Sequence, residues 1–351
     1  MISTFTLLGI DAIPVTVEVD FLRRLPSVAI VGLPSVSVRE SADRVRSAML
    51  ISGFSFPRQR VVVSLSPADL RKDGTGFDLA IAAAILEKAG HIPPVAERYA
   101  FIGELTLGGQ VRPVRGAAAF ARQHPEITLV CAEGMARKVA AMGGRAIGIQ
   151  TLGQLGEVAS LPLTPASANE ETLPPVVDFA DVRVDLGILQ ELALAARTRT
   201  PVILVGPPGC GKTMLAARCP GLLPDMTTEE VREVSVVQDA AGLLGDASLR
   251  RERPFRAPHH SISVAGMTGG ALLRPGECSL AHRGVLFLDE VSEFPRQVMD
   301  AGCVREKRVP SLDSCGFTAG LQAQPTRLQP VSSVKHRGHE VLPAACLDDR
   351  T

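Results

Sequence analysis

The sequence has no tryptophan and a single tyrosine, Tyr99. Proteins that bind single-stranded nucleic acid by stacking on its bases need aromatic side chains, so this mode of binding is disfavoured. Basic and acidic residues are equal in number, 37 of each, and the formal net charge is zero. The charge balance therefore gives no overall signature of nucleic-acid binding. It still allows a basic surface confined to one place, such as the pore of a ring of subunits.

The seven cysteines show no C-x-x-C spacing. A structural zinc site or a disulfide framework is therefore disfavoured, and reduced thiols in a cytoplasm fit the pattern better. The N-terminus has no basic stretch leading into a long apolar run. No segment has the roughly 18 uninterrupted apolar residues that a membrane span requires. We expect a cytoplasmic protein with neither a signal peptide nor a membrane span.

A chain of 351 residues is long for one domain, and its patterns divide it into four parts. Residues 1–160 alternate predicted strands (28–33, 61–65, 127–131 and 146–149) with helices, including one over 77–90, and a hairpin over 101–114. Residues 161–177 contain four prolines and are interpreted as a linker. Residues 178–300 form a second α/β unit. Residues 301–351 show no convincing period and are expected to be irregular.

A glycine-rich segment between a predicted strand and a predicted helix carries the strongest chemical signal. Residues 201–217, PVILVGPPGCGKTMLAA, contain G-x-x-x-x-G-K-[ST]. In such loops backbone N–H groups wrap the phosphates of a nucleotide, and the following helix directs its positive end at them. Lys212 is expected to reach the β- and γ-phosphates, and the Thr213 hydroxyl to bind Mg²⁺. The predicted nucleotide-binding residues are Gly206, Pro207, Pro208, Gly209, Cys210, Gly211, Lys212, Thr213 and Met214.

The second half of this site is expected in GVLFLDE, residues 284–290. A short apolar strand ends there in two carboxylates, and open α/β sheets place their sites at the carboxyl ends of strands. Asp289 is expected to support the Mg²⁺ ion. Glu290 is expected to orient the attacking water, with Lys212 as the second catalytic residue. An isolated Asp-Glu pair is commonly just solvated, but the upstream phosphate loop favours a site for ATP and Mg²⁺.

A weaker set of candidates lies in RPFRAPHHSIS, residues 253–263. Adjacent histidines point in different directions on a strand or a helix, so a metal site at His259 and His260 is disfavoured. Hydrogen-bonded or loop histidines are the ordinary interpretation, and a solvated surface is the ordinary role for Arg256. Contact of Arg253 and Arg256 with phosphate or DNA is the alternative.

Long, ordered blocks of the sequence resemble the ComM/YifB family of magnesium-chelatase-like AAA+ ATPases over about residues 1–298. They are VGLPSVSVRESADRVRSA and VVVSLSPADLRKDGTGFDLAIAAAIL in the N-terminal half, and GPPGCGKTMLA and LRPGECSLAHRGVLFLDE in the second half. The resemblance implies an α/β fold with a ribosomal-S5-like, Lon-protease-like N-terminal domain before an AAA+ P-loop NTPase core. It also implies a homo-hexameric DNA helicase that drives branch migration in recombination and natural transformation. Arg256, His259 and His260 would then face DNA in the ring pore.

The sequence departs from the family pattern in three places. Gly76 stands where a Lon-type protease would have its serine nucleophile, so we expect no proteolysis. A Gly-Gln pair that the family places beside the nucleotide base is missing near Val184 and Asp185. The pattern also stops near Met299, and no sensor, arginine finger or lid is recognisable beyond it. We interpret the chain as a C-terminally truncated or frameshifted member, with residues 301–351 out of frame or disordered.

The sequence therefore predicts a Mg²⁺-ATP-binding protein of ComM type whose hydrolysis is impaired. The same features leave two alternatives open. One is a magnesium-chelatase-type ATPase subunit that remodels a protein partner. The other is a non-catalytic interaction protein that uses only its N-terminal domain.

Overall fold

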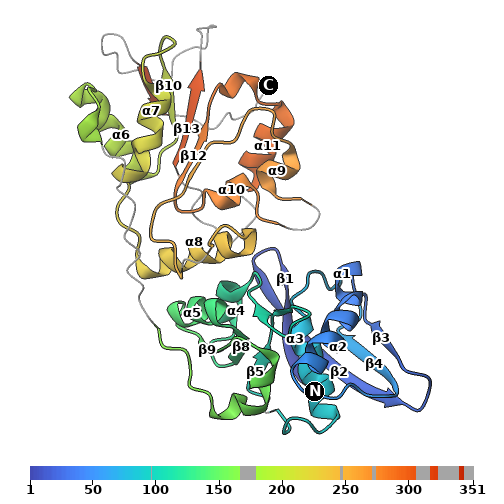
Figure 1. Cartoon of the computed structure of the whole chain (residues 1–351). Helices are drawn as coiled ribbons and strands as arrows, with labels where there is room; N and C mark the ends of the chain where they lie inside the picture. The colour runs from blue at the N-terminus through green and yellow to red at the C-terminus, as the bar shows by residue number, and fades with distance from the viewer. Residues whose placement is uncertain are drawn as a thin grey trace. The chain divides into compact units, whose positions relative to one another are not determined.

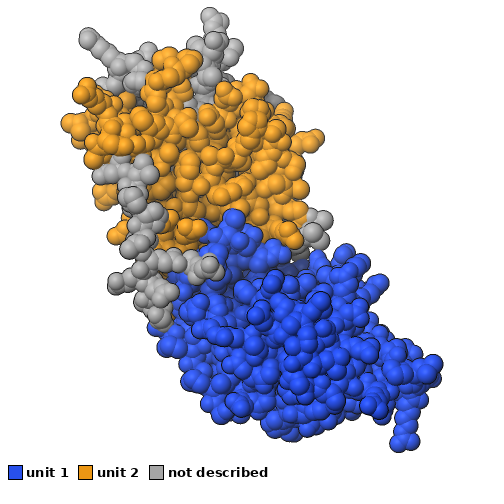
Figure 2. Space-filling model, viewed as in Figure 1, with its two compact units in different colours: residues 1–169, 238–249 blue, residues 170–237, 250–351 orange. Residues whose placement is uncertain are grey.

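The computed structural model describes residues 1–95, 97–166, 179–245, 248–270, 274–305, 317–322 and 340–343. The chain divides into two compact units (Figure 2). Unit 1 comprises residues 1–169 and 238–249, and unit 2 comprises residues 170–237 and 250–351. Unit 1 thus takes in a segment from the middle of the predicted second domain. Most of the predicted linker, from residue 167 onward, lies outside the described residues.

Unit 1 is built on a seven-stranded mixed sheet with the order β3-β4-β2-β1-β5-β8-β9 (Figure 1). Its strands are β1 (Ile2–Leu8), β2 (Asp11–Leu22), β3 (Ser27–Val31), β4 (Arg60–Ser66), β5 (Tyr99–Phe101), β8 (Thr128–Ala132) and β9 (Arg145–Ile149). Strand β2 runs antiparallel to both β1 and β4. The pairs β3–β4, β1–β5, β5–β8 and β8–β9 are parallel. The four strands predicted from short apolar runs are confirmed.

The predicted hairpin over 101–114 is partly confirmed. Its turn joins β6 (Glu104–Leu105) to β7 (Val111–Arg112), but Phe101 belongs to β5 of the large sheet. The helices of unit 1 are α1 (Val36–Arg39), α2 (Ser41–Ile51), α3 (Asp78–Lys88), α4 (Ala117–Gln123), α5 (Glu133–Ala141) and the 3-10 helix η1 (Leu152–Ser160). Helices α1 and α2 follow one another directly and meet at Glu40.

Helix α3 forms the centre of unit 1, and every residue from Asp78 to Leu86 is buried. A helix that is apolar on all sides belongs inside a core, so the run LAIAAAIL explains its position. Asp78 is the exception, and its carboxylate is fully satisfied. It accepts hydrogen bonds from Arg44 Nε at 2.7 Å, from the Leu105 N–H at 3.1 Å and from the Ser41 hydroxyl. This polar cluster ties α2 and β6 to the start of α3.

Gly76 lies just before α3 in a tightly packed place. A Cβ added at this position would lie 3.2 Å from Ile102 Cγ1 and 3.3 Å from Val114 Cγ2. Contacts this short require the neighbours to shift, because interiors are packed close to crystal density. A serine at this position would therefore require Ile102 and Val114 to move by a few tenths of an ångström.

Unit 2 contains a five-stranded sheet with the order β11-β12-β13-β10-β14. Its strands are β10 (Val202–Val205), β11 (Phe255–Arg256), β12 (Val285–Leu288), β13 (Phe317–Gln322) and β14 (Glu340–Pro343). Neighbouring strands are parallel, apart from the antiparallel pair β10–β14. The α-helices in this part of the chain are α6 (Leu186–Thr198), α7 (Lys212–Arg218), α8 (Thr228–Ala241), α9 (Val264–Thr268), α10 (Glu277–Leu280) and α11 (Arg296–Arg305). Three 3-10 helices join them: η2 (Phe179–Asp181), η3 (Cys219–Leu222) and η4 (Val291–Glu293).

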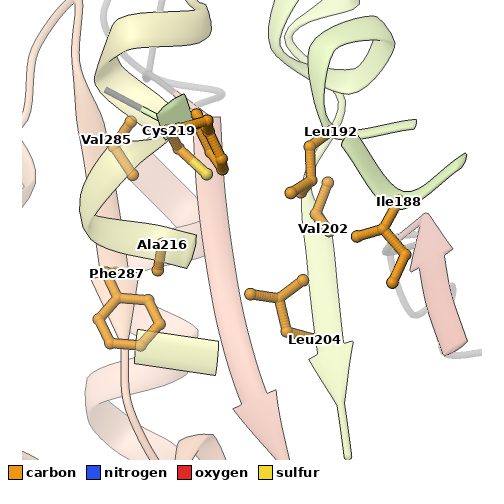
Figure 3. Close-up of a cluster of buried hydrophobic side chains, with 9 residues drawn as sticks. Ile188, Leu192, Val202, Leu204, Ala216, Cys219, Val285 and Phe287 are labelled. Atoms are coloured by element: carbon orange, nitrogen blue, oxygen red, sulfur yellow. The ribbon is translucent and has the colours of Figure 1, made fainter. Parts of the chain in front are cut away.

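A buried cluster joins the two site-bearing strands to α6 and α7 (Figure 3). Its members are Phe179, Ile188, Leu192, Val202, Leu204, Ala216, Cys219, Val285 and Phe287. Burial raises the pKa of the Cys219 thiol to about 12, so this cysteine behaves as a small apolar side chain. The cluster fixes β10 and β12 against the helix that follows the glycine-rich loop.

Regular structure continues beyond the predicted end of the second α/β unit. Helix α11 runs to Arg305, and strands β13 and β14 lie in the segment where the sequence pattern showed no period. Strand β13 pairs with β12 on one side and with β10 on the other. The predicted irregular segment therefore contributes backbone to the middle of the sheet. The remainder of residues 306–351 lies outside the described residues.

Candidate nucleotide-binding site

The two predicted halves of the site follow strands that end at the same edge of the unit 2 sheet. Strands β10 and β12 are both parallel to β13. Near their carboxyl ends, Val205 pairs with Gln322 and Leu288 pairs with Gly320. The glycine-rich loop continues from β10, and Asp289 continues from β12. Neighbouring parallel strands therefore bring the loop and the carboxylates to one edge, where open α/β sheets bind ligands.

Two glycines give the loop its shape. Gly209 has a φ of 78° and Gly211 a φ of 86°, both in the left-handed region that side chains disfavour. Gly211 is the residue immediately before α7, so the chain turns sharply out of the loop into the helix. The sequence places glycine where this turn requires it.

Lys212 is held over the loop by the loop's own backbone. Its Nζ donates hydrogen bonds to the carbonyl oxygens of Gly206 and Pro207, each at 2.9 Å. Thr213, at the start of α7, and Asp289, after β12, are both exposed at this edge. Hard oxygen donors of this kind suit Mg²⁺ together with substrate phosphates, so the residues present fit a Mg²⁺-nucleotide.

Glu290 follows Asp289 in a constrained backbone conformation. Its φ of 52° lies in the left-handed region, and its side chain is 57% exposed. A residue other than glycine in this conformation costs on the order of 1 kcal/mol or more, and such strain is often found at functional sites. The N–H of Glu293 donates to the Glu290 carbonyl at 2.8 Å and closes the turn into η4.

The structure places His260 beside Glu290. Nδ1 of His260 is 3.9 Å from Oε2 of Glu290, and the imidazole meets the Phe294 ring edge-on with centroids 6.5 Å apart. The centroid of the His259 ring lies 4.0 Å from the centroid of the His260 ring. Sequence analysis grouped His260 with the DNA candidates and missed this contact. No local pattern could reveal it, since it depends on the pairing of β11 with β12.

The other two DNA candidates have protein partners. Arg256 forms a bidentate ion pair with Glu277, with Nε and Nη2 at 2.6 Å and 2.7 Å from its oxygens. These hydrogen bonds raise the pKa of Arg256. Nδ1 of the exposed His259 lies 2.9 Å from the Ser261 hydroxyl. Contact of Arg256, His259 and His260 with DNA stays a prediction.

The segment before α6 has its own contacts at the place where the family pattern has a Gly-Gln pair. Asp185 caps α6, because its side chain accepts a hydrogen bond from the Gly187 N–H at 2.8 Å. Asp181 accepts from Arg218 of α7 at 2.6 Å, which ties η2 to the helix after the glycine-rich loop. Sequence analysis did not identify this ion pair.

A glycine-rich loop and an acidic strand end, brought together by a parallel sheet, define a P-loop α/β protein. Comparison with protein families narrows this class. Residues 178–306 match the family model described as magnesium chelatase, subunit ChlI, and residues 17–132 match that described as subunit ChlI of Mg-chelatase. The chain belongs to the magnesium-chelatase-like AAA+ family that includes YifB and ComM.

Several curated relatives support this assignment. The chain is 38% identical to YifB of Escherichia coli (strain K12) over 312 residues, and 38% identical to the competence protein ComM of Haemophilus influenzae over 307 residues. It is 40% identical to an uncharacterized protein of Mycobacterium tuberculosis (strain H37Rv) over 312 residues. The matches cover 84–86% of this chain and 60–61% of the relatives. The chain thus spans less than two thirds of their length.

The described residues contain neither a membrane-spanning helix nor a cluster of metal-binding side chains. None of their helices combines the length and the apolar content needed to cross a membrane. Within the same residues, no three His, Cys, Asp or Glu side chains gather as a metal-binding group. A Mg²⁺ site that is completed by phosphates needs no such group, because the ion keeps few protein ligands.

Proposed function

We propose that this chain binds Mg²⁺-ATP at the edge of the unit 2 sheet and works on DNA as a ComM-type branch-migration helicase. One observation carries the nucleotide assignment: the Lys212 amine lies over the Gly206–Gly211 loop, at the same sheet edge as Asp289 and Glu290. The match to the magnesium-chelatase family model over residues 178–306 supports it. The name of the relative ComM, a competence protein, supports DNA as the partner.

Each residue of the site has a proposed role that follows from its chemistry. Lys212 exchanges its two carbonyl partners for the β- and γ-phosphate oxygens. Thr213 and Asp289 hold Mg²⁺, which when bound neutralises charge on the phosphates. Glu290 accepts a hydrogen bond from the attacking water and orients it. The loop residues Gly206, Pro207, Pro208, Gly209, Cys210 and Gly211 surround the phosphates, with Met214 flanking them.

For unit 1 we propose a ribosomal-S5-like, non-proteolytic domain that serves assembly or DNA contact. The packing around Gly76 supports the absence of a serine nucleophile. A homo-hexamer with ATP between subunits and a cytoplasmic location remain part of the proposal. Hydrolysis by this chain is proposed to be slow, since no sensor, arginine finger or lid is recognisable in the sequence after residue 300. A trans arginine alone contributes about 10³–10⁵ in rate.

The test is nucleotide binding by the full chain, measured with a fluorescent ATP analogue in the presence and absence of Mg²⁺. Lys212→Ala is expected to weaken binding by at least about tenfold, because it removes the cation that meets the phosphates. Lys88→Ala is the matched control, since Lys88 lies in unit 1 and pairs with the exposed Asp20 at 3.4 Å. Equal binding by wild type and Lys212→Ala would contradict the proposal.

A second candidate function rests on the family models, both of which are described by a chelatase subunit. In this alternative the ATPase remodels a protein partner instead of DNA. ATP-dependent capture of a protein partner, with no binding to DNA, would favour it. The third possibility, an interaction protein that uses unit 1 alone, predicts unchanged behaviour after Lys212→Ala.

A further inference from the structure

Unit 1 contains two stretches of sequence with arginines and no acidic residue. The first, residues 21–39, contains Arg23, Arg24 and Arg39. The second, residues 44–68, contains Arg44, Arg46, Arg58 and Arg60. The chain as a whole has no net charge, so these stretches concentrate positive charge locally. No lysine contributes to either stretch.

The sheet topology brings the two stretches to one place. Strand β4 lies between β2 and β3, antiparallel to the first and parallel to the second (Figure 1). Arg60, the first residue of β4, pairs with Leu22 at the end of β2 and with Ser27 at the start of β3. The connection between β2 and β3 therefore crosses the start of β4. Arg23 and Arg24 in that connection share one end of the sheet with Arg58 and Arg60.

Arg46 extends this group through an aromatic ring. Its guanidinium carbon lies 5.7 Å from the centroid of Phe56, which is two residues before Arg58. Arg23, Arg24, Arg46 and Arg58 are exposed. We call these four residues and the half-buried Arg60 the arginine surface.

The arginine surface is unneutralised within the part of the chain that the structure describes. None of its five guanidinium groups forms an ion pair there, whereas the nearby Arg44 is paired with Asp78 at 2.7 Å. The nearest acid along β2, Asp20, pairs with Lys88 at 3.4 Å. Arg60 Nε is buried and has no hydrogen-bond partner among the described residues.

We propose that the arginine surface binds the phosphate backbone of a nucleic-acid strand. The guanidinium fork donates two parallel hydrogen bonds to phosphate oxygens, which a lysine ammonium cannot do in fixed geometry. The arginines lie in the β2–β3 connection, on α2 and at the start of β4, and their binding to successive phosphates would release condensed counterions. This inference rests on the proposed function in taking DNA as the partner. It adds the surface of unit 1 that binds the DNA.

An anionic membrane surface would also attract these arginines, but the structure favours nucleic acid. Membrane-bound surfaces combine basic residues with a broad apolar face. Here the most exposed apolar side chains near the arginines lie on two different elements, Leu25 in the β2–β3 connection and Leu50 and Ile51 at the end of α2, and do not follow one amphipathic helix face. The Phe56 ring is half-buried under Arg46 and is not free to insert into lipid.

The test compares the full chain with the variant Arg23→Glu/Arg24→Glu in binding to labelled single-stranded and duplex oligonucleotides over a range of salt concentrations. The charge-matched control is Arg112→Glu/Arg145→Glu, which changes two exposed arginines of the same unit, on β7 and β9. The arginine-surface variant should bind at least about tenfold more weakly, with a salt slope lower by about two. The control should keep the wild-type affinity and slope.

Three outcomes would overturn the inference. They are equal losses in both variants, no loss in either, and no binding of either oligonucleotide by the wild type. Binding to anionic vesicles that is lost only in the arginine-surface variant, without oligonucleotide binding, would assign the surface to a membrane. Binding of the fluorescent ATP analogue, measured on the same samples, reports on the nucleotide site independently. A result against nucleic-acid binding at the arginine surface can therefore be distinguished from a result against ATP binding at the proposed site.

Discussion

Nδ1 of His260 lies 3.9 Å from Oε2 of Glu290, the carboxylate proposed to orient water. The two residues are far apart in sequence, and the parallel pairing of β11 with β12 brings them together. His260 is 36% exposed and Glu290 57%, so solvent screens the contact and it is weak in energy. The contact nevertheless places an imidazole beside the carboxylate proposed to orient water.

Replacement of His260 is expected to alter turnover more than binding. In His260→Ala, Glu290 loses its neighbour and orients water less well, so single-turnover hydrolysis should slow several-fold. The affinity for Mg²⁺-ATP should stay unchanged, because His260 does not belong to the loop around the phosphates. His260→Gln should recover part of the rate. A loss of nucleotide affinity equal to the loss of rate would point to a structural role instead.

Glu290→Gln separates binding from hydrolysis. The amide keeps the shape of the side chain but cannot accept a proton from water, so hydrolysis should fall by about 10²–10⁴-fold. Binding of the fluorescent ATP analogue should remain at the wild-type level, in contrast to Lys212→Ala. The measurement is single-turnover release of labelled phosphate with protein in excess over ATP, because the wild-type rate is itself proposed to be slow. Undiminished release by Glu290→Gln would remove this residue from the catalytic assignment.

Asp78→Ala tests the polar cluster at the start of α3. The substitution leaves Arg44 without its partner at 2.7 Å and Leu105 without its acceptor at 3.1 Å. Breaking one side of a buried ion pair costs about 3–5 kcal/mol, and we expect a loss of this size in the free energy of unfolding. Urea unfolding would measure it. Asp43→Ala, at an exposed position on α2, should cost less than about 1 kcal/mol.

Glu233 should make the stability of unit 2 depend on pH. Burial raises the pKa of its carboxyl, but hydrogen bonds from Arg283 at 2.8 Å and with His282 at 3.0 Å outweigh burial, and the pKa is lowered overall. A depressed pKa stabilises the fold above the unfolded value of 4.5, and this stabilisation is lost as the pH falls through the folded value. Glu233→Gln should therefore destabilise the protein at neutral pH and much less in acid. Unfolding curves of wild type and Glu233→Gln at neutral and at acid pH would show this dependence. An equal loss of stability at both pH values would contradict the assignment.

Gly76→Ser tests the close packing before α3. The added atoms would press on Ile102 and Val114 at 3.2–3.3 Å, and overpacking of a core costs about 1–3 kcal/mol. Gly156→Ser is the matched control, because a Cβ there meets nothing within 4 Å. Thermal unfolding of the two variants is expected to differ, with Gly76→Ser melting lower. Equal melting temperatures would show that the site accommodates a side chain.

Short continuous signals in the sequence were sufficient to predict much of this fold. Val202–Val205 and Val285–Leu288 are apolar runs of strand length, and LAIAAAIL is too apolar for any place but a core. Contacts between residues far apart in the sequence could not be predicted from local sequence patterns. The position of β13 between β10 and β12, and the approach of His260 to Glu290, depend on pairing between distant segments. The same holds for the inclusion of residues 238–249 in unit 1.

The crowding at Gly76 also limits which side chains this position accommodates. A larger side chain at this position would need Ile102 and Val114 to move by a few tenths of an ångström. Moving packed neighbours costs stability unless the new side chain gains contacts in return. Glycine is therefore the residue that this junction between the loop and α3 accommodates with the least rearrangement.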